Sequence, residues 1–144
     1  MRMCSFTSLS SHDLSILSLF RPIVSSIELL GSGTYSTSFS TSNAHLALNV
    51  TSYPEGAKLF LTGHTSNAPA NVQLHPEFQG IFELSSSVVT PAVVVVEQEG
   101  RRVEFERDGG SVKGSVWKKK NTEMVKEGGE VIVSTSNAPN ILML

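Results

Sequence analysis

The chain has 144 residues, a formal net charge of −2 and a sequence pI near 6.1, and 17% of its residues are charged. This length suits one domain with its own core, and the weakly acidic balance excludes the positive field that attracts nucleic acid or an anionic membrane surface. No window of the sequence is apolar over the length that spans a bilayer, and the single cysteine, Cys4, excludes an internal disulfide.

Residues 1–32 are predicted to be a leader, poorly ordered or helical, that precedes the folded domain. Its apolar run 14–20 is similar to the hydrophobic region of a signal peptide, but His12 and Asp13 precede the run and Arg21 and Pro22 follow it. Because these flanks and the lack of a clear small-residue cleavage site are atypical, secretion by this route is not favoured. The lone cysteine slightly favours an intracellular protein over a secreted one.

From residue 33 onward, apolar and polar side chains alternate, which is typical of half-buried β-strands. Pro54-Glu55-Gly56 and Asp108-Gly109 supply turns between strands. The continuous apolar run 93–96 predicts a strand that is buried on both faces. The expected strands, in chain order, cover residues 33–40, 46–50, 58–62, 72–74, 78–84, 93–96, 103–105, 111–117 and 130–133.

The tetrapeptide Thr-Ser-Asn-Ala occurs three times, and each copy precedes an alternating apolar run. Asn tolerates left-handed backbone conformations and bonds nearby backbone, and a following proline prevents helix, so the motif predicts a corner that begins a strand. Stacked corners are expected to align their threonines and asparagines in ladders. The predicted corner residues are Thr41, Asn43, Thr65, Asn67, Pro69, Thr135, Asn137 and Pro139.

The spacing of the motifs predicts a stack of similar coils. The separation of Asn67 from Asn137 along the chain is close to three times the separation of Asn43 from Asn67. Ser87 and Gly110 lie near the two missing positions. We therefore predict an all-β, β-solenoid-like stack of strand coils over residues 33–144, with a β-sandwich as the alternative fold.

Motifs that occur in a fixed order carry a resemblance to a known family. Residues 65–84 contain Thr-Ser-Asn-Ala-Pro and then a Phe-x-Gly-x-Phe step, residues 114–117 read Gly-Ser-Val-Trp, and residues 131–139 end on a second Thr-Ser-Asn-Ala-Pro. From residue 40 to its end, the chain resembles a fungal domain family of unknown function, adhesin-like and related in pattern to adhesin-type β-solenoids. The resemblance implies an all-β repeat domain without assigned catalytic or binding residues. The chain departs from the family's pattern at residues 85–87, which lack the corner asparagine.

The sequence contains no arrangement of side chains that is typical of an enzyme. Glu104 and Glu106 share a strand face, but the neighbouring arginines are expected to neutralise them. No Gly-x-Ser-x-Gly elbow or phosphate-binding loop is present. Metal-ligand spacing is also missing among the four histidines and Cys4, which are His12, His45, His64 and His75. We therefore predict no catalytic residue, no cofactor and no metal.

The predicted function is that of a non-catalytic, adhesin-like β-repeat domain that binds a glycan or a protein through a flat strand face. Trp117 is the side chain best suited to stack on such a ligand. The alternative is an intracellular structural or assembly module that pairs through open coil ends or edge strands. Neither reading includes nucleic acid or a membrane span.

Overall fold

The computed structural model describes residues 13–118 and 128–144, and all regular elements in these two ranges are β-strands. The strands are β1 (Asp13–Ser18), β2 (Ile23–Glu28), β3 (Gly33–Thr41), β4 (Leu46–Ser52), β5 (Ala57–Thr65), β6 (Ala70–Gln73), β7 (Gly80–Ser86), β8 (Ala92–Val94), β9 (Arg101–Asp108), β10 (Ser111–Lys118), β11 (Gly129–Thr135) and β12 (Asn140–Met143).

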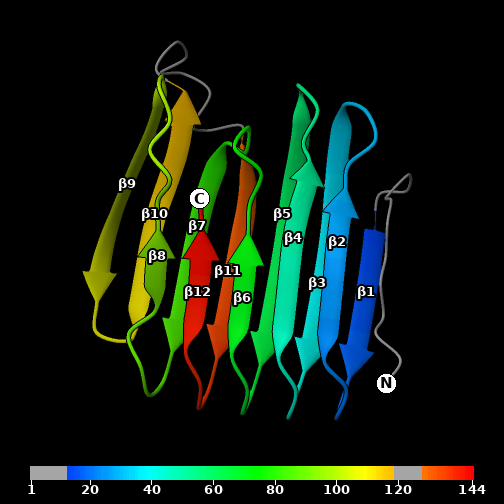
Figure 1. The fold of residues 1–144 in the computed structure, drawn as a ribbon, viewed down its shortest axis with the longest axis vertical. Helices are drawn as coiled ribbons and strands as arrows, with labels where there is room; N and C mark the ends of the chain where they lie inside the picture. The colour runs from blue at the N-terminus through cyan, green and yellow to red at the C-terminus, as the bar shows by residue number, and fades with distance from the viewer. Residues whose placement is uncertain (1–12, 119–127) are drawn as a thin grey trace.

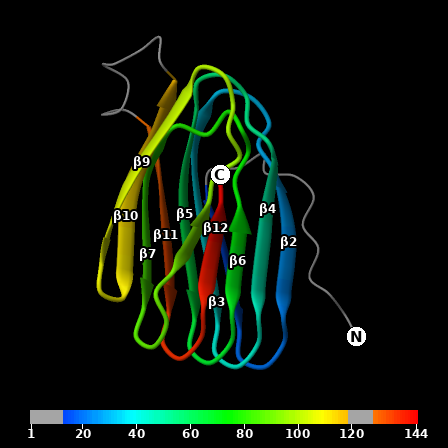
Figure 2. The same cartoon turned by 60° about the vertical axis from the view of Figure 1, so that its left-hand side comes forward.

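The strands form two sheets that face each other (Figures 1 and 2). The seven-stranded sheet has the order β1-β3-β5-β11-β7-β10-β9, and the five-stranded sheet has the order β2-β4-β6-β12-β8. Neighbouring strands are parallel except for β10, which is antiparallel to both β7 and β9. The chain thus alternates between the sheets up to β8, and β9 and β10 then extend only the seven-stranded sheet.

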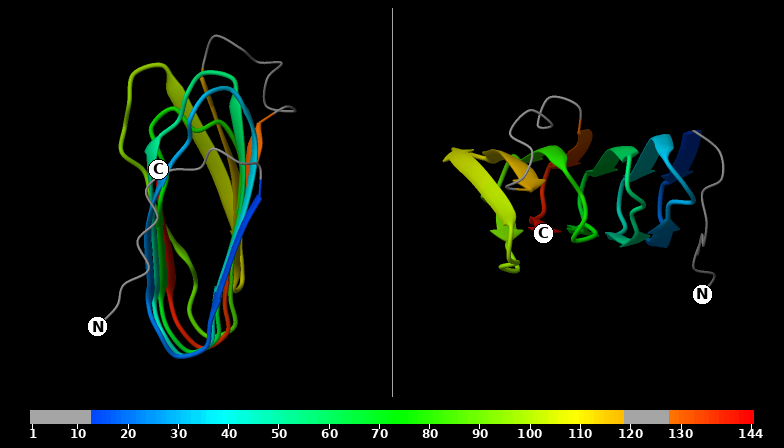
Figure 3. Two further views of the ribbon diagram at one scale, coloured as in Figure 1. Left: turned by 90° about the vertical axis from the view of Figure 1, so that its right-hand side faces the viewer. Right: turned by 90° about the horizontal axis from the view of Figure 1, so that it is seen from above.

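The core lies between the two layers, which Figure 3 shows edge-on. Alternate residues of each strand point inward, as in β5, where Leu59 and Leu61 are 0% and 1% exposed and Phe60 between them is 38% exposed. Aromatic side chains fill the wider parts of the core, among them Phe39, Phe78 and Phe82. Burial of these alternating rows drives the two sheets together.

The predicted β-solenoid is wrong. A solenoid adds its coils in sequence order, whereas here β11 lies between β5 and β7, and β12 lies between β6 and β8. The segment between Asn67 and Asn137 is therefore not three steps of a stack, because it forms β6 to β10 and then returns, as β11, to a place beside β5. The β-sandwich alternative also fails, since sandwiches are built from antiparallel sheets. The fold is a two-layer arrangement of mostly parallel sheets.

The predicted leader differs from the structure over residues 13–32. β1 pairs with β3 and β2 pairs with β4, both in parallel, so the folded body includes this part of the chain. Ile23 and Ile27 are 1% and 2% exposed, and their burial explains why the segment forms strand instead of a separate leader. Residues 1–12 lie outside the described ranges. The described residues include no helix that is long and apolar enough to cross a membrane.

The run 93–96 is not buried on both faces as predicted. Val94, Val95 and Val96 are 44%, 38% and 56% exposed, and only Val93 packs against the core. The reason is that β8 is the edge strand of its sheet and ends at Val94, so the last two valines belong to the loop that leads to β9.

Tyr53 is a core residue whose ionisation affects the stability of the fold at high pH. Its ring is 8% exposed and packs edge-on against Phe78, with ring centroids 5.8 Å apart. Burial raises the pKa of the Tyr53 phenol to about 12, against a smaller opposing effect of the Leu59 backbone. The folded state therefore holds this phenol neutral to a higher pH than the unfolded chain does.

We expect Tyr53→Phe to remove part of the loss of stability at high pH. Because the folded pKa lies above the unfolded value near 10, the stabilising contribution is complete below that pH and disappears as the pH rises toward about 12. Urea unfolding between about pH 9 and pH 12 should show the unaltered chain losing about 1–2 kcal/mol more than the variant. Equal losses in both proteins would show that Tyr53 ionises alike in the folded and unfolded states.

Candidate functional site

The three Thr-Ser-Asn-Ala motifs form corners that join the two sheets. Thr41 and Thr135 are both register partners of Thr65, so the threonines form one row across β3, β5 and β11. Each threonine hydroxyl donates a hydrogen bond to the carbonyl of the alanine three residues later, which closes the turn. The threonines are 0–4% exposed. They hold the corner together and are not available to a ligand.

The asparagines of the same motifs form an exposed amide ladder. Asn67 Nδ2 donates to Asn43 Oδ1 over 2.7 Å, and Asn137 Nδ2 donates to Asn67 Oδ1 over 2.8 Å. Backbone bonds follow the same order, because the amide groups of Asn67 and Asn137 donate to the carbonyls of Ser42 and Ser66. The carbonyls of Pro69 and Pro139 accept hydrogen bonds from the backbone amides of Leu46 and Ala70, which begin the neighbouring strands β4 and β6.

We expect Thr65→Val to destabilise the chain by about 1–3 kcal/mol, because the substitution keeps the shape but leaves the Ala68 carbonyl without its donor in a buried corner. Ser66→Ala, at the next position, is the matched control and should change the stability by less than about 0.5 kcal/mol. Urea unfolding measures both. A Thr65→Val variant as stable as the control would show that the hydroxyl does not hold the corner.

Two further corners lack the motif: the one at residues 85–87, where a degraded copy was expected, and one at Ser18 that the sequence analysis missed. Ser18 and Ser86 occupy the threonine row, as register partners of Thr41 and Thr135. Ser18 Oγ accepts a bond from the Arg21 amide, and Ser86 Oγ donates to the Ala138 carbonyl. The signal that remains in the sequence is a serine followed by proline four or five residues later, at Pro22 and Pro91.

The outer face of the five-stranded sheet carries the most coherent surface of the described residues. In register across β2, β4, β6 and β12, one row reads Ser26, Asn49, Gln73 and Met143. The adjacent row reads Val24, Ala47, Asn71 and Ile141. All eight positions are uncharged, and all of them except Ile141 line a shallow depression of about 350 Å³. We call this surface the amide face.

The amide face presents evenly spaced hydrogen-bonding groups. Asn49, Asn71 and Gln73 are exposed, and each side-chain amide offers both a donor and an acceptor. Neighbouring strands are about 4.8 Å apart, so groups in one row repeat at that interval. Figure 1 shows these strands side by side with little change of direction. The arrangement suits an extended ligand with repeated polar groups.

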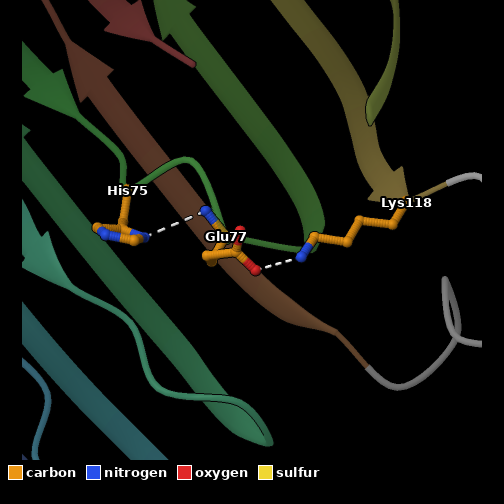
Figure 4. A network of polar contacts seen from close by, with 3 residues as sticks. All are labelled: His75, Glu77 and Lys118. Carbon is orange, nitrogen blue, oxygen red and sulfur yellow. Dashed lines mark hydrogen bonds and ion pairs between the residues drawn. The ribbon is translucent and has the colours of Figure 1, made fainter. Parts of the chain in front are cut away.

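The histidines of the described residues take part in separate local contacts. His64 Nδ1 lies 2.8 Å from Ser134 Oγ on the outer face of the seven-stranded sheet. His75 Nδ1 accepts a bond from the Glu77 amide over 3.1 Å, and the Glu77 carboxylate pairs with Lys118 (Figure 4). His45 is exposed at a corner, and His12 and Cys4 lie outside the described ranges. Within those ranges, no group of three or more histidine, cysteine or acidic side chains is placed to hold a metal ion.

Trp117 lies in β10, far from the amide face in strand order and on the other sheet. The Arg102 guanidinium lies over its ring, 5.8 Å from the centroid, so one ring face is already occupied. Arg102 also pairs with Glu104 over 2.8 Å, with both side chains more than half exposed. The structure therefore gives Trp117 and the acidic residues of β9 a charged, solvated setting, and it does not bring them together with the corner residues.

Comparisons of the chain with protein-family models, with curated proteins and with solved structures give no match.

Proposed function

We propose that this chain is a non-catalytic, adhesin-like binding module that holds a neutral glycan on the amide face. The observation that carries the proposal is the pair of uncharged rows across β2, β4, β6 and β12, with their exposed amides and shallow depression. Glycan hydroxyls both donate and accept hydrogen bonds, which complements side-chain amides. Val24, Ala47 and Met143 add apolar area for the less polar faces of sugar rings.

Repetition is the expected source of affinity. A flat strand face buries less of a ligand than an enclosed pocket does, so each contact is weak. A polymer that spans several strands engages several amides at once, and its second and later contacts form at a high effective concentration. Insoluble polysaccharides are accordingly better probes of this face than single sugars.

The test is co-sedimentation of the full chain with insoluble β-glucan and chitin. We expect saturable retention that falls about tenfold or more in the double variant Asn49→Ala/Gln73→Ala, which removes two exposed amides from one row. The matched control is Ser38→Ala/Thr62→Ala, a pair of register partners on the other sheet, and it should bind like the unaltered chain. The protein for this test should be expressed in bacteria, because glycosylation of Asn49 in the sequon Asn49-Val50-Thr51 would cover part of the amide face.

Absence of retention by a folded sample would contradict glycan binding, and equal loss in both double variants would contradict the amide face as its site. Circular dichroism of each variant keeps loss of fold apart from loss of binding.

A second candidate function is assembly through the edge formed by β1 and β2. Among the described strands, each of these two ends its sheet, so one side of its backbone has no strand partner there. Large apolar side chains are exposed beside this edge: Leu17 (74%), Leu19 (59%), Phe20 (76%) and Leu30 (51%). Sedimentation velocity of the chain tests this candidate, which predicts concentration-dependent oligomers that Phe20→Ser weakens. A monomer at all concentrations would contradict it.

A further inference from the structure

The guanidinium of Arg101 lies at the end of the structure where the seven-stranded sheet extends beyond the five-stranded sheet. Arg101 is the first residue of β9, and its Nε, Nη1 and Nη2 atoms are all buried without a hydrogen-bond partner among the described residues. A guanidinium carries five N–H donors, and a buried charge is normally paired and hydrogen-bonded. The setting of Arg101 therefore lacks a component that accepts these bonds.

Within residues 13–118 and 128–144, the acidic groups near Arg101 are engaged elsewhere or are exposed. The Glu77 carboxylate pairs with Lys118, the register partner of Arg101, as Figure 4 shows for the first two residues. Burial is the largest influence on the Arg101 pKa and lowers it, and the charge of Glu77 acts in the opposite direction. Glu97 and Glu99 lie in the exposed loop before β9 and make no bond to the guanidinium.

A cavity adjoins this arginine. The five-stranded sheet ends at β8, so none of its strands lies opposite β9 and β10. The loop from Val95 to Glu99 faces β9 instead. The space between them is about 580 Å³, within the usual range for small-molecule sites. Val95, Val96 and Val103 give it an aliphatic lining beside Arg101. Arg102 also borders the cavity, but it is bound to Glu104 and Trp117.

We propose that this cavity binds a small organic carboxylate, with the carboxylate on the Arg101 guanidinium and an aliphatic chain along the three valines. The guanidinium fork matches a carboxylate in two parallel hydrogen bonds. A phosphate dianion fits less well, because Glu97 and Glu99 border the cavity and repel a second negative charge. The guanidinium nitrogens are covered in the unliganded chain, so binding requires side chains around the cavity to rearrange; Val95 and Val96, which line it, are 38% and 56% exposed.

Isothermal titration of the full chain with octanoate tests the proposal, with inorganic phosphate as the comparison ligand. We expect one octanoate per chain, and we expect Arg101→Gln to weaken its binding about tenfold or more. Arg107→Gln is the matched control, because Arg107 lies in the same strand but does not border the cavity, and its octanoate binding should stay within about twofold. Absence of octanoate binding, equal binding by Arg101→Gln, or phosphate binding as tightly as octanoate would each overturn the assignment.

The stability of the unliganded chain gives an independent test. An unpaired buried charge lowers stability, so Arg101→Met should leave the melting temperature unchanged or raise it. A fall of several degrees would show that Arg101 has a partner within the chain, and the carboxylate site would then be withdrawn. The effect of Arg101→Met on stability does not depend on whether the amide face binds a glycan, because Arg101 and the amide rows lie on different sheets.

Discussion

Deletion of residues 128–144 should abolish cooperative unfolding of the chain. β11 pairs with both β5 and β7, and β12 pairs with both β6 and β8, so the deletion separates each sheet into two parts. The deleted segment also contributes buried aliphatic side chains at Val131, Val133, Leu142 and Leu144. Each is worth about 1.5–3 kcal/mol, and their sum is comparable with the whole stability of a typical domain, about 5–15 kcal/mol.

Thermal melting followed by circular dichroism measures this loss, and two point variants locate it. Leu142→Asp puts a charge at a position that is 0% exposed and should unfold the chain, whereas Met143→Asp, at 39% exposed, should be tolerated. A truncated chain that melts cooperatively at the original temperature would contradict the central place of β11 and β12. So would equal effects of the two aspartate variants.

Gly129→Ala should strongly destabilise the chain. Gly129 begins β11 between β5 and β7, and a Cβ atom there would lie 2.3 Å from the Leu59 carbonyl oxygen and 2.8 Å from the Leu59 nitrogen. Both atoms belong to the backbone of a central strand, which cannot shift without breaking its own ladder. We expect a loss of about 3 kcal/mol in the free energy of unfolding.

Glu130→Ala is the matched control for this substitution, since the next side chain is only partly buried and points to the other face. Its effect should be below about 0.5 kcal/mol in urea unfolding. Gly80 faces Gly129 from β7, and a Cβ atom at Gly80 would lie 2.0 Å from the Gly129 carbonyl oxygen. Gly80→Ala should therefore destabilise the chain as Gly129→Ala does. Tolerance of both alanines would show that the three strands do not approach as closely as described.

The local features of the fold follow from short-range sequence patterns. Period-two alternation located most strands from residue 33 onward, because burial of one face needs only neighbouring residues to agree, but it did not locate β1 and β2. The corner residues were also recognisable, since the bond from Thr65 to Ala68 joins positions three residues apart. The degraded corner at residues 85–87 was recognisable from its position, whereas the corner at Ser18 was missed because it keeps the hydroxyl and lacks the asparagine.

Surface and site features were harder to predict. The threonines and the asparagines of the motif were both expected to form ladders. The sequence did not show that the threonine row would be buried and the asparagine row exposed. The amide face joins residues from four strands whose separation in sequence has no period of its own. The unpaired state of Arg101 depends on where the sheets stop matching, which no local pattern records.

The sequence by itself determined that this protein is built from short strands and Thr-Ser-Asn-Ala corners, because those preferences act within a few residues. Only the tertiary structure decided the strand order, with β11 and β12 beside β5 and β6 and with β1 and β2 inside the folded body. The physical reason is that the edges of parallel strands present nearly the same row of N–H and C=O groups. A strand's neighbour is therefore selected by the packing of all inward side chains together, and that selection is a property of the whole core.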